Sequence, residues 1–223
     1  MKIGVIVAVE FSLLAEIYGA KEQIETVGCY RIFTSKKENL EMIFLESGPG
    51  EIQAGAGTQF MIDRYCPKLI VNIGLAGGLV DQIKVGDTYI IDGVVHTDYN
   101  VGKQGVYPGL KGTKILLNKQ LLEKFAQAGS LSVVSCASQD KVIMGDDVRR
   151  RMAKDWDCQI CDMELAAIGL ICLKNKVPLV SMKVVSDTIG SSWASMDDWN
   201  LRFAENFKGL ATLLRECEKI DKY

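Results

Sequence analysis

The stretch LIVNIGLAGGL, residues 69–79, is an apolar run that ends among three glycines. Short runs rich in Ile, Val and Leu are typical of strands buried on both faces of a parallel sheet. Glycines after such a strand let the backbone approach a ligand or a neighbouring helix closely. We therefore expect a central strand over Leu69–Ile73, with a candidate binding loop directly after it.

Similar runs and helical patterns alternate along the rest of the chain. Further strands are predicted at Lys2–Val9, Glu41–Leu45, Thr88–Val95, Ser132–Ser135 and Leu179–Val185. Helices are predicted at Phe11–Tyr18, Glu51–Tyr65, Lys119–Ala128, Asp146–Trp156, Met163–Asn175 and Asp197–Lys219. This alternation predicts one three-layer α/β domain over residues 1–223, with a central mixed, largely parallel twisted sheet flanked by helices. The one long irregular loop is expected at Asn100–Thr113.

The composition narrows the class of partner. A formal charge of −2 gives no electrostatic reason to expect nucleic acid or a charged membrane surface as a partner. No stretch approaches the roughly 20 apolar residues that span a bilayer. The first ten residues reach a carboxylate at Glu10 after a short apolar run, which is a poor secretory signal. We expect a cytoplasmic protein without nucleic-acid or membrane partners.

Cysteine and histidine usage limits the chemistry. The seven cysteines include one C-x-x-C pair, Cys158 and Cys161, and His96 is the only histidine. A structural zinc site needs two more ligands than that pair supplies, so we predict reduced cysteines near a core strand and no metal. A Ser-His-Asp or Cys-His catalyst would depend on His96 alone. Any acid–base chemistry is therefore expected from carboxylates.

Polar residues follow several predicted strands. Ligands of such sheets bind beyond the carboxyl ends of the strands, where Glu10 and Ser186-Asp187 stand, and Glu164 begins a predicted helix. Two acids in separate turns could meet at one pocket. By pattern alone, Asp187 could equally be a helix cap or turn residue, and Glu164 could complement a helix N-terminus.

The glycines give no clear cofactor signature. Gly48-Pro49-Gly50 follows a predicted strand, but Gln53 occupies the position where a dinucleotide fingerprint needs glycine, and a P-loop motif is absent from the sequence. We expect no cofactor.

Six collinear motifs together carry a resemblance that covers the chain from residue 1 to the predicted C-terminal helix. They are MKIGVIVAVE (1–10), SGPGEIQAGAGTQ (47–59), NIGLAGGL (72–79), VGDTYIIDG (85–93), CDMELAAIG (161–169) and VVSDTIG (184–190). In order and spacing they resemble the purine nucleoside phosphorylase/uridine phosphorylase superfamily, and most closely its methylthioadenosine/S-adenosylhomocysteine nucleosidase branch.

The resemblance implies a nucleoside site with two halves. Asp187, oriented by Ser186, looks like the acid that protonates N7 of a purine leaving group. Glu164 looks like the acceptor for the ribose 2′- and 3′-hydroxyls, with Met163 beneath the sugar. The remaining substrate-binding residues that it implies are Asp162, Val142, Ile143, Gly77, Leu75 and Lys183.

Several positions depart from the branch's pattern. Ser12 stands where the nucleosidases place a water-activating Glu, and Lys183 where they place its supporting Arg. Leu75 replaces a Ser, and Val142 an aromatic residue that stacks on the base. Glu10 is the nearest remaining carboxylate and our candidate for the substitute base.

Three functions remain open. The first is hydrolysis of an adenosine-type nucleoside related to methylthioadenosine or S-adenosylhomocysteine. The second is phosphorolysis, which Asn72 disfavours because the phosphorylases have an arginine there, although Lys183 could attract phosphate. The third is a nucleoside-sensing protein without turnover, which Ser12 and Leu75 favour and Asp187 opposes. The resemblance also implies a homodimer, with Tyr99, Val106 and Tyr107 of the Asn100–Thr113 loop region at its seam.

Overall fold

The computed structural model describes residues 1–37, 39–99 and 114–191 of the chain. The predicted loop Asn100–Thr113 and the predicted helix Asp197–Lys219 lie outside these residues. The strands are β1 (Lys2–Val7), β2 (Glu25–Val27), β3 (Tyr30–Lys37), β4 (Leu40–Glu46), β5 (Leu69–Gly78), β6 (Thr88–His96), β7 (Lys114–Leu116), β8 (Ser132–Ser138), β9 (Ile160–Asp162) and β10 (Leu179–Asp187).

Within the described residues these strands form one mixed sheet in the order β10-β6-β8-β9-β5-β1-β4-β3-β2, with β7 beside β6. β4, β1, β5 and β10 form a parallel ladder, because β10 also pairs with β5. β6 joins β10 in the antiparallel sense, and β8 runs parallel to β6. The mixed α/β architecture with a parallel centre is confirmed.

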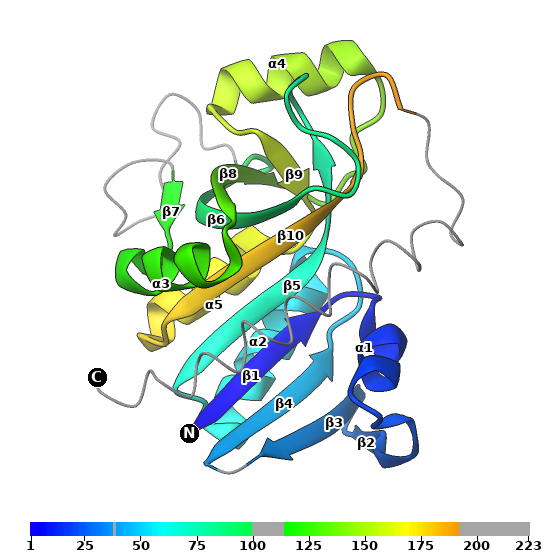
Figure 1. Ribbon diagram of the computed structural model, residues 1–223, viewed down its shortest axis with the longest axis vertical. Helices are drawn as coiled ribbons and strands as arrows, with labels where there is room; N and C mark the ends of the chain where they lie inside the picture. Colours follow the sequence, from blue (N-terminus) through cyan, green and yellow to red (C-terminus); the bar gives the residue numbers. More distant parts are fainter. Residues whose placement is uncertain (38, 100–113, 192–223) are drawn as a thin grey trace.

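The helices cover the sheet on two sides (Figure 1). They are α1 (Phe11–Ile17), α2 (Glu51–Tyr65), α3 (Lys119–Gly129), α4 (Asp146–Trp156) and α5 (Leu165–Asn175), with a short 3₁₀ turn at Lys21–Gln23. Phe11 of α1 and Phe125 of α3 belong to the core on one face, whereas Met61 of α2 and Ile168 of α5 belong to the core on the other.

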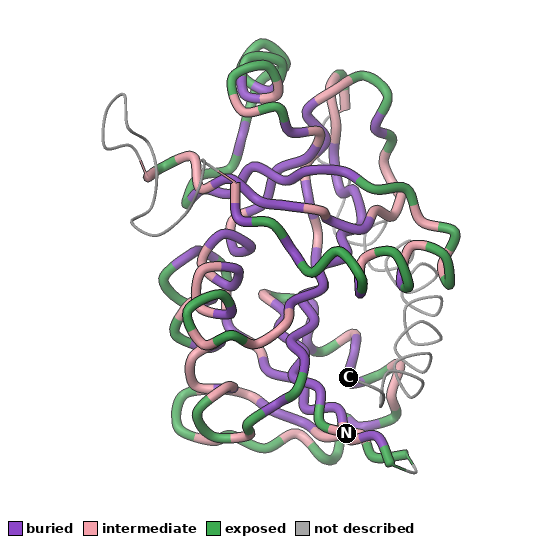
Figure 2. The backbone as a smooth tube through the Cα atoms, turned by 90° about the vertical axis from the view of Figure 1, so that its left-hand side faces the viewer, coloured by how far each residue is buried: buried purple, intermediate pink, exposed green. Residues whose placement is uncertain are grey.

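Alternation along β1 shows why both faces are apolar. Val5 and Val7 belong to the α1/α3 core, while Ile6, between them, belongs to the α2/α5 core. Successive strand residues point to opposite faces, so a strand covered on both sides has to be apolar throughout. The residues through the middle of the molecule are accordingly buried, whereas buried and exposed residues alternate along the outer helices and loops (Figure 2).

The structure extends five of the predicted strands (β4, β5, β6, β8 and β10), ends β1 at Val7 instead of Val9 and adds four strands. β5 continues past Ile73 to Gly78, and β8 past Ser135 to Ser138, so both reach the edge where the candidate residues lie. β2, β3, β7 and β9 were not predicted. Three of them have only three residues each, too few for a periodic signal, and β3 carries exposed polar residues at its end. No helix of the described residues is long and apolar enough to cross a membrane.

Candidate active site

The candidate site is a cavity of about 250 Å³ at the carboxyl ends of the parallel strands. Its size is near the lower end of small-molecule pockets. The lining residues come from the turns after β1, β4, β8 and β9, from the ends of β5, β9 and β10, and from α4: Ala8, Val9, Glu10, Pro49, Leu75, Ala76, Gly77, Lys141, Val142, Ile143, Arg149, Cys161, Asp162, Met163, Glu164, Ser186 and Asp187. Every residue predicted for the site lines this cavity except Lys183.

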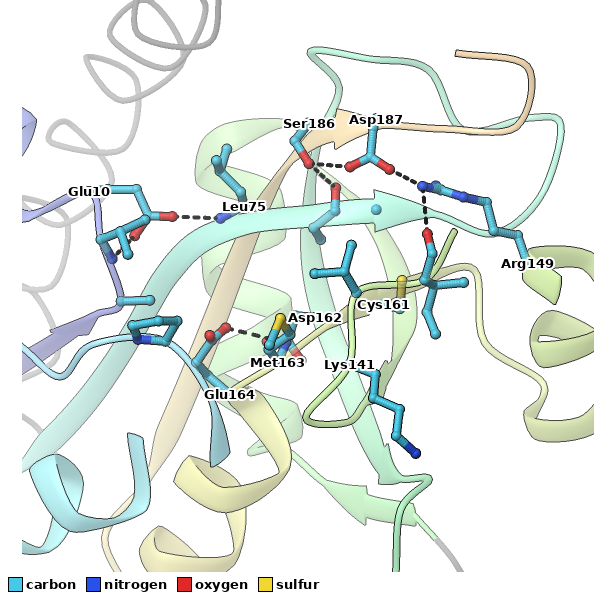
Figure 3. Close-up of a pocket in the computed structure, with 17 residues that line it drawn as sticks. Glu10, Leu75, Lys141, Arg149, Cys161, Asp162, Met163, Glu164, Ser186 and Asp187 are labelled. Carbon is cyan, nitrogen blue, oxygen red and sulfur yellow. Dashed lines mark hydrogen bonds and ion pairs between the residues drawn. The ribbon is translucent and has the colours of Figure 1, made fainter. Parts of the chain in front are cut away.

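The cavity has two chemically different ends (Figure 3). Glu10 and Glu164 lie at one end, and Ser186, Asp187 and Arg149 lie at the other. Apolar side chains of Leu75, Met163 and Ile143 belong to the same lining. A flat apolar group held between an acidic end and a hydrogen-bonding end would fit this arrangement.

Asp187 is the last residue of β10 and is 5% exposed. Its Oδ1 accepts a hydrogen bond from Ser186 Oγ at 2.6 Å, as expected if Ser186 orients it. Its Oδ2 forms an ion pair with Arg149, which the sequence analysis did not predict. The carboxyl group is therefore fixed on both sides at one end of the cavity.

Arg149 reaches this position from α4. Its guanidinium also donates to the carbonyl oxygens of Gly78, at 2.9 Å, and Ile143, at 3.1 Å. A Cβ on Gly77 would lie 3.3 Å from Arg149 Nη1 and 3.4 Å from Asp187 Oδ2, so glycine at this position leaves the pair its space. The two carbonyls and the carboxylate hold a fully charged group that is only 5% exposed.

Glu164 immediately precedes α5 and is 8% exposed. Its Oε1 accepts from the backbone amide of Gly50 at 3.0 Å, and its Oε2 from that of Met163 at 3.3 Å. Burial raises the pKa of Glu164 to about 7; Asp162 adds to this rise, and Lys183 opposes it. The carboxyl group can therefore change its protonation state near neutral pH.

Gly50, whose amide bonds Glu164, has a backbone conformation that favours glycine. Its φ of +95° lies in a region that side chains with a Cβ rarely adopt. A Cβ there would also lie 2.9 Å from Asp140 Oδ1. The glycine after β4 thus presents its backbone amide to Glu164.

Lys183 does not line the cavity. Its Nζ pairs with Asp162 Oδ2 at 2.7 Å, and both side chains are almost completely buried. Burial alone would lower the pKa of Lys183, but Asp162 and Glu164 outweigh it and the pKa is raised. The ammonium group thus pairs with Asp162 behind the cavity wall, and the expected contact of Lys183 with substrate or phosphate stays a prediction.

Glu10 is placed by two backbone amides. Its Oε1 accepts from Leu75 at 3.1 Å and its Oε2 from Val9 at 3.0 Å, which directs the carboxylate into the cavity at the end of β5. It also lies close enough to Glu164 to contribute to the raised pKa of that residue. Ser12, by contrast, is exposed on α1 and accepts a hydrogen bond from Arg31 at 3.3 Å.

The base-side residues show a mixed picture. Ile143 is buried and Val142 is 49% exposed at the rim, so this end has a small apolar side chain where the resemblance would place an aromatic ring. Arg149 and Cys161 complete the wall and were missed by the sequence analysis. The run Arg149-Arg150-Arg151 in a helical pattern is typical of a solvated face, so nothing in it marked Arg149 as buried.

The cysteine pair fits the structural interpretation. Cys158, just before β9, and Cys161, within it, are buried free thiols, and burial raises the pKa of each to about 12. Among the described residues, no group of three His, Cys, Asp or Glu side chains could hold a metal ion. The carboxylates are therefore the groups available here for acid–base chemistry.

Comparison with known proteins agrees with this geometry. Residues 2–216 match the sequence model of the phosphorylase superfamily. The 5′-methylthioadenosine/S-adenosylhomocysteine nucleosidase of Geobacillus thermodenitrificans is 30% identical over 203 residues, which is 85% of each chain.

Solved structures share the fold. A futalosine hydrolase mutant of Helicobacter pylori has a TM-score of 0.86 at 20% identity, over 97% of this chain and 99% of that one. The 5′-methylthioadenosine/S-adenosyl homocysteine nucleosidase of the same species has a TM-score of 0.87 at 20% identity, over 97% and 98%. The family match and the relative from Geobacillus, together with this fold, place the chain in the phosphorylase superfamily, among the 5′-methylthioadenosine/S-adenosylhomocysteine nucleosidases.

Proposed function

We propose that the protein hydrolyses the N-glycosidic bond of a purine nucleoside. The observation that carries the proposal is the pairing, in one cavity, of a buried Asp187 at one end with Glu164 and Glu10 at the other. A nucleoside matches these two ends. Its leaving base needs a proton donor such as Asp187, and its ribose, which becomes positively charged, needs carboxylates such as Glu164 and Glu10. The membership of the nucleosidase family supports the same reaction.

Each carboxyl group has a role in this reaction. In its protonated form, Asp187 donates a proton to N7 of the base as the bond between C1′ and N9 breaks, so that the bonding electrons leave on a neutral purine. Arg149 stabilises the carboxylate that remains. Glu164 accepts the ribose hydroxyls and stabilises the oxocarbenium-like sugar. Glu10 accepts a proton from the water whose oxygen bonds to C1′.

The charges at the sugar end favour water over phosphate as the nucleophile. Glu10 and Glu164 are both carboxyl groups, and the nearest ammonium, Lys183, is already paired with Asp162. A phosphate anion needs a cationic or amide-rich cradle. Here the amides of Leu75 and Gly50 are used by Glu10 and Glu164. An entering phosphate would meet carboxylates without a free cation among the described lining residues of this end.

The relatives' names suggest the substrate class. We propose an adenosine-type nucleoside of the 5′-methylthioadenosine or S-adenosylhomocysteine kind, cleaved in the cytoplasm by a homodimer. The apolar lining that includes Val9, Leu75 and Met163 suits a thioether better than a charged 5′ group.

The test is a panel of purine nucleosides incubated with the enzyme, with and without phosphate, followed by identification of the sugar product. We expect free base and free sugar at a rate that phosphate does not change. Formation of a sugar 1-phosphate, dependent on added phosphate, would show a phosphorylase instead. Tight binding of nucleosides without cleavage would show a sensing protein.

A further inference from the structure

We propose that Glu51 is a positioning residue for the sugar end: from outside the cavity, its carboxyl group holds Glu164 in place through the first turn of α5. Glu51 is the first residue of α2 and is 7% exposed, but it does not line the cavity. Neither the proposed reaction nor the nucleosidase resemblance gives this buried acid a role. The inference rests on the proposed function, because it takes Glu164 to accept the ribose hydroxyls.

Two connections join the start of α2 to the start of α5. The amide of Gly50 donates to Glu164 Oε1 at 3.0 Å. The next residue, Glu51, accepts from the amide of Ala167 with Oε2 and from Ser138 Oγ with Oε1, the latter at 2.6 Å. Because Gly50 and Glu51 are neighbours, and Glu164 and Ala167 lie within one helical turn, the two connections act on the same short piece of chain. Without the Glu51 carboxyl group, fewer bonds fix the position of Glu164 relative to the Gly50 amide.

The junction around Glu51 is buried and closely packed. Ser138 is completely buried at the end of β8, and its Oγ also accepts from the amide of Ala166 at 3.2 Å. One turn further along α2, a Cβ on Gly55 would lie 3.5 Å from Ala167 Cβ, so the two helices are in close contact. Closely packed interiors transmit strain instead of absorbing it. Removal of the Glu51 carboxyl group should therefore shift the start of α5.

The surroundings of Glu51 make this hold depend on its protonation state. Burial raises the pKa of Glu51 to about 8. The bonds from Ser138 and Ala167 oppose this rise, whereas two charged groups that face Glu51, Asp162 of β9 and Asp140 of the turn after β8, add to it. The side chain is therefore mainly the neutral acid below pH 8 and becomes a carboxylate as the pH rises through 8. Since like charges repel, this carboxylate should loosen the junction beside Asp162 and Asp140.

Discrimination between adenosine and 2′-deoxyadenosine tests the inference, because the two nucleosides differ only in a hydroxyl that Glu164 is proposed to accept. Glu51→Ala removes both side-chain bonds. At pH 7.5 we expect it to lower the ratio of kcat/KM for adenosine to kcat/KM for 2′-deoxyadenosine about 10-fold, the effect of weakening one hydrogen bond to a charged group. A smaller amount of folded enzyme would reduce both values equally and leave the ratio unchanged.

Asp63→Ala is the matched control, because it removes an exposed carboxyl group of the same helix that is bonded to Gln59. It should leave the ratio at its wild-type value. An unchanged ratio in a folded Glu51→Ala enzyme would overturn the proposal.

Glu51→Gln separates the hold from the charge, and it replaces the alanine variant if circular dichroism shows that Glu51→Ala does not fold. Glutamine still accepts from Ala167 and donates to Ser138, but it cannot ionise. At pH 7.5 its ratio should match that of wild type. Between pH 8 and pH 9.5 the wild-type ratio should fall, whereas the ratio of Glu51→Gln should stay constant. Parallel pH profiles for the two proteins would count against the role of Glu51.

Calorimetric binding and a crystal structure separate this inference from the reaction. The affinity ratio of adenosine to 2′-deoxyadenosine should show the same loss in Glu51→Ala. This result would support the positioning role even if neither nucleoside were cleaved, in which case only the proposed hydrolysis would fail. In a crystal structure of Glu51→Ala, the Glu164 carboxyl group should have moved away from the Gly50 amide. An unchanged Glu164 would refute the proposal whatever the activity.

Discussion

We expect each carboxyl group of the site to have its own role in the reaction. Asp187 should act mainly in the transition state, as the proton donor to the base. Asp187→Asn should abolish turnover while nucleoside affinity stays within about tenfold, because a proton donor is needed only as the bond breaks. Steady-state kinetics and calorimetric binding on the same sample measure both quantities. Asp81→Asn, at the exposed partner of Arg150, is the control. A variant that keeps most of its kcat would remove Asp187 from the mechanism.

Glu10 should contribute to catalysis by accepting a proton from the attacking water. Its two amide bonds hold the carboxylate in place, and replacing it by Gln preserves its size but removes its basicity. We expect Glu10→Gln to lower kcat on the order of 10²-fold, the range for loss of a general base. Glu16→Gln, an exposed change in α1, the helix that follows Glu10, should have no effect. Full activity of Glu10→Gln would mean that positioning alone activates the water.

The raised pKa of Glu164 predicts that the preference for ribonucleosides over 2′-deoxyribonucleosides depends on pH. Its pKa of about 7 means that the carboxylate, which accepts hydroxyl hydrogen bonds, forms as the pH rises through neutrality. The preference for ribonucleosides over 2′-deoxyribonucleosides should therefore be larger at pH 8 than at pH 6, with rates measured at both. Glu164→Gln should give a small preference that is independent of pH. Equal rates for the two sugars at every pH would contradict the assignment.

The charged residues of the site show which positions could be predicted from the sequence and which could not. Asp187 ends β10 and Glu10 stands between β1 and α1, so the parallel ladder brings these two to one edge as expected, where Glu164 joins them from the turn after β9. Lys183 lies within a strand that is buried at every position, and its ammonium had to find a partner behind the wall. That partner, and the burial of Arg149, depend on tertiary packing that no local pattern encodes.

The first turn of α5 is the element on which the sugar end depends. Its amides are satisfied by side chains from three other elements: Asp162 accepts from Leu165, Ser138 from Ala166 and Glu51 from Ala167. Ser138 Oγ also donates to Glu51 Oε1 at 2.6 Å. These bonds tie β9, β8 and α2 to the helix end that carries Glu164. The sequence predicted α5 from its apolar run, but it started the helix two residues early because the caps come from distant segments.

Glu51 makes this junction sensitive to pH. Burial raises the pKa of Glu51 to about 8, against 4.5 for an unperturbed Glu. The folded state therefore favours the protonated form, and the stability that it contributes is present at pH 4 and is lost as the pH rises through about 8. In Glu51→Gln the side chain cannot ionise, so its stability should exceed that of wild type increasingly at higher pH, by on the order of a few kcal/mol.

Urea unfolding of both proteins at pH 5, 7 and 9 measures this difference. The exposed Glu22→Gln should follow the wild-type curve at each pH. Parallel pH profiles for wild type and Glu51→Gln would show that Glu51 is ionised in the fold at no cost.

The whole molecule explains why segments so far apart in sequence share one cavity. β5 pairs in parallel with β1 over Leu69–Asn72 and with β10 over Ile70–Gly77, and β9 runs antiparallel to its end, so the turns after β1, β10 and β9 meet at one edge. The alternation of strands and helices predicted the ladder. It could not predict that β9, with only three residues, would bring Asp162 and Glu164 to the same edge.

Several apolar side chains in or near the cavity lining are exposed to solvent. Val9 is 60% exposed and Val142 49%, and both line the cavity; Met144, close by in sequence, is 62% exposed, and Ile52, near Pro49, is 82% exposed. Exposed apolar groups that gather at one place mark an interaction site more often than scattered ones do. In a closed two-fold dimer, the same patch of each chain can be covered by the other.

We therefore expect a dimer at micromolar concentration by light scattering, and a charge on one of these exposed apolar side chains should weaken it. Ile52→Glu should shift the equilibrium toward monomer and lower activity at low protein concentration, with partial recovery at high concentration by mass action. Leu173→Glu is the matched control, since Leu173 is also exposed, at 47%, but lies in α5 outside the cavity lining. A monomeric wild type, or equal effects of the two charges, would place the exposed rim outside any dimer interface.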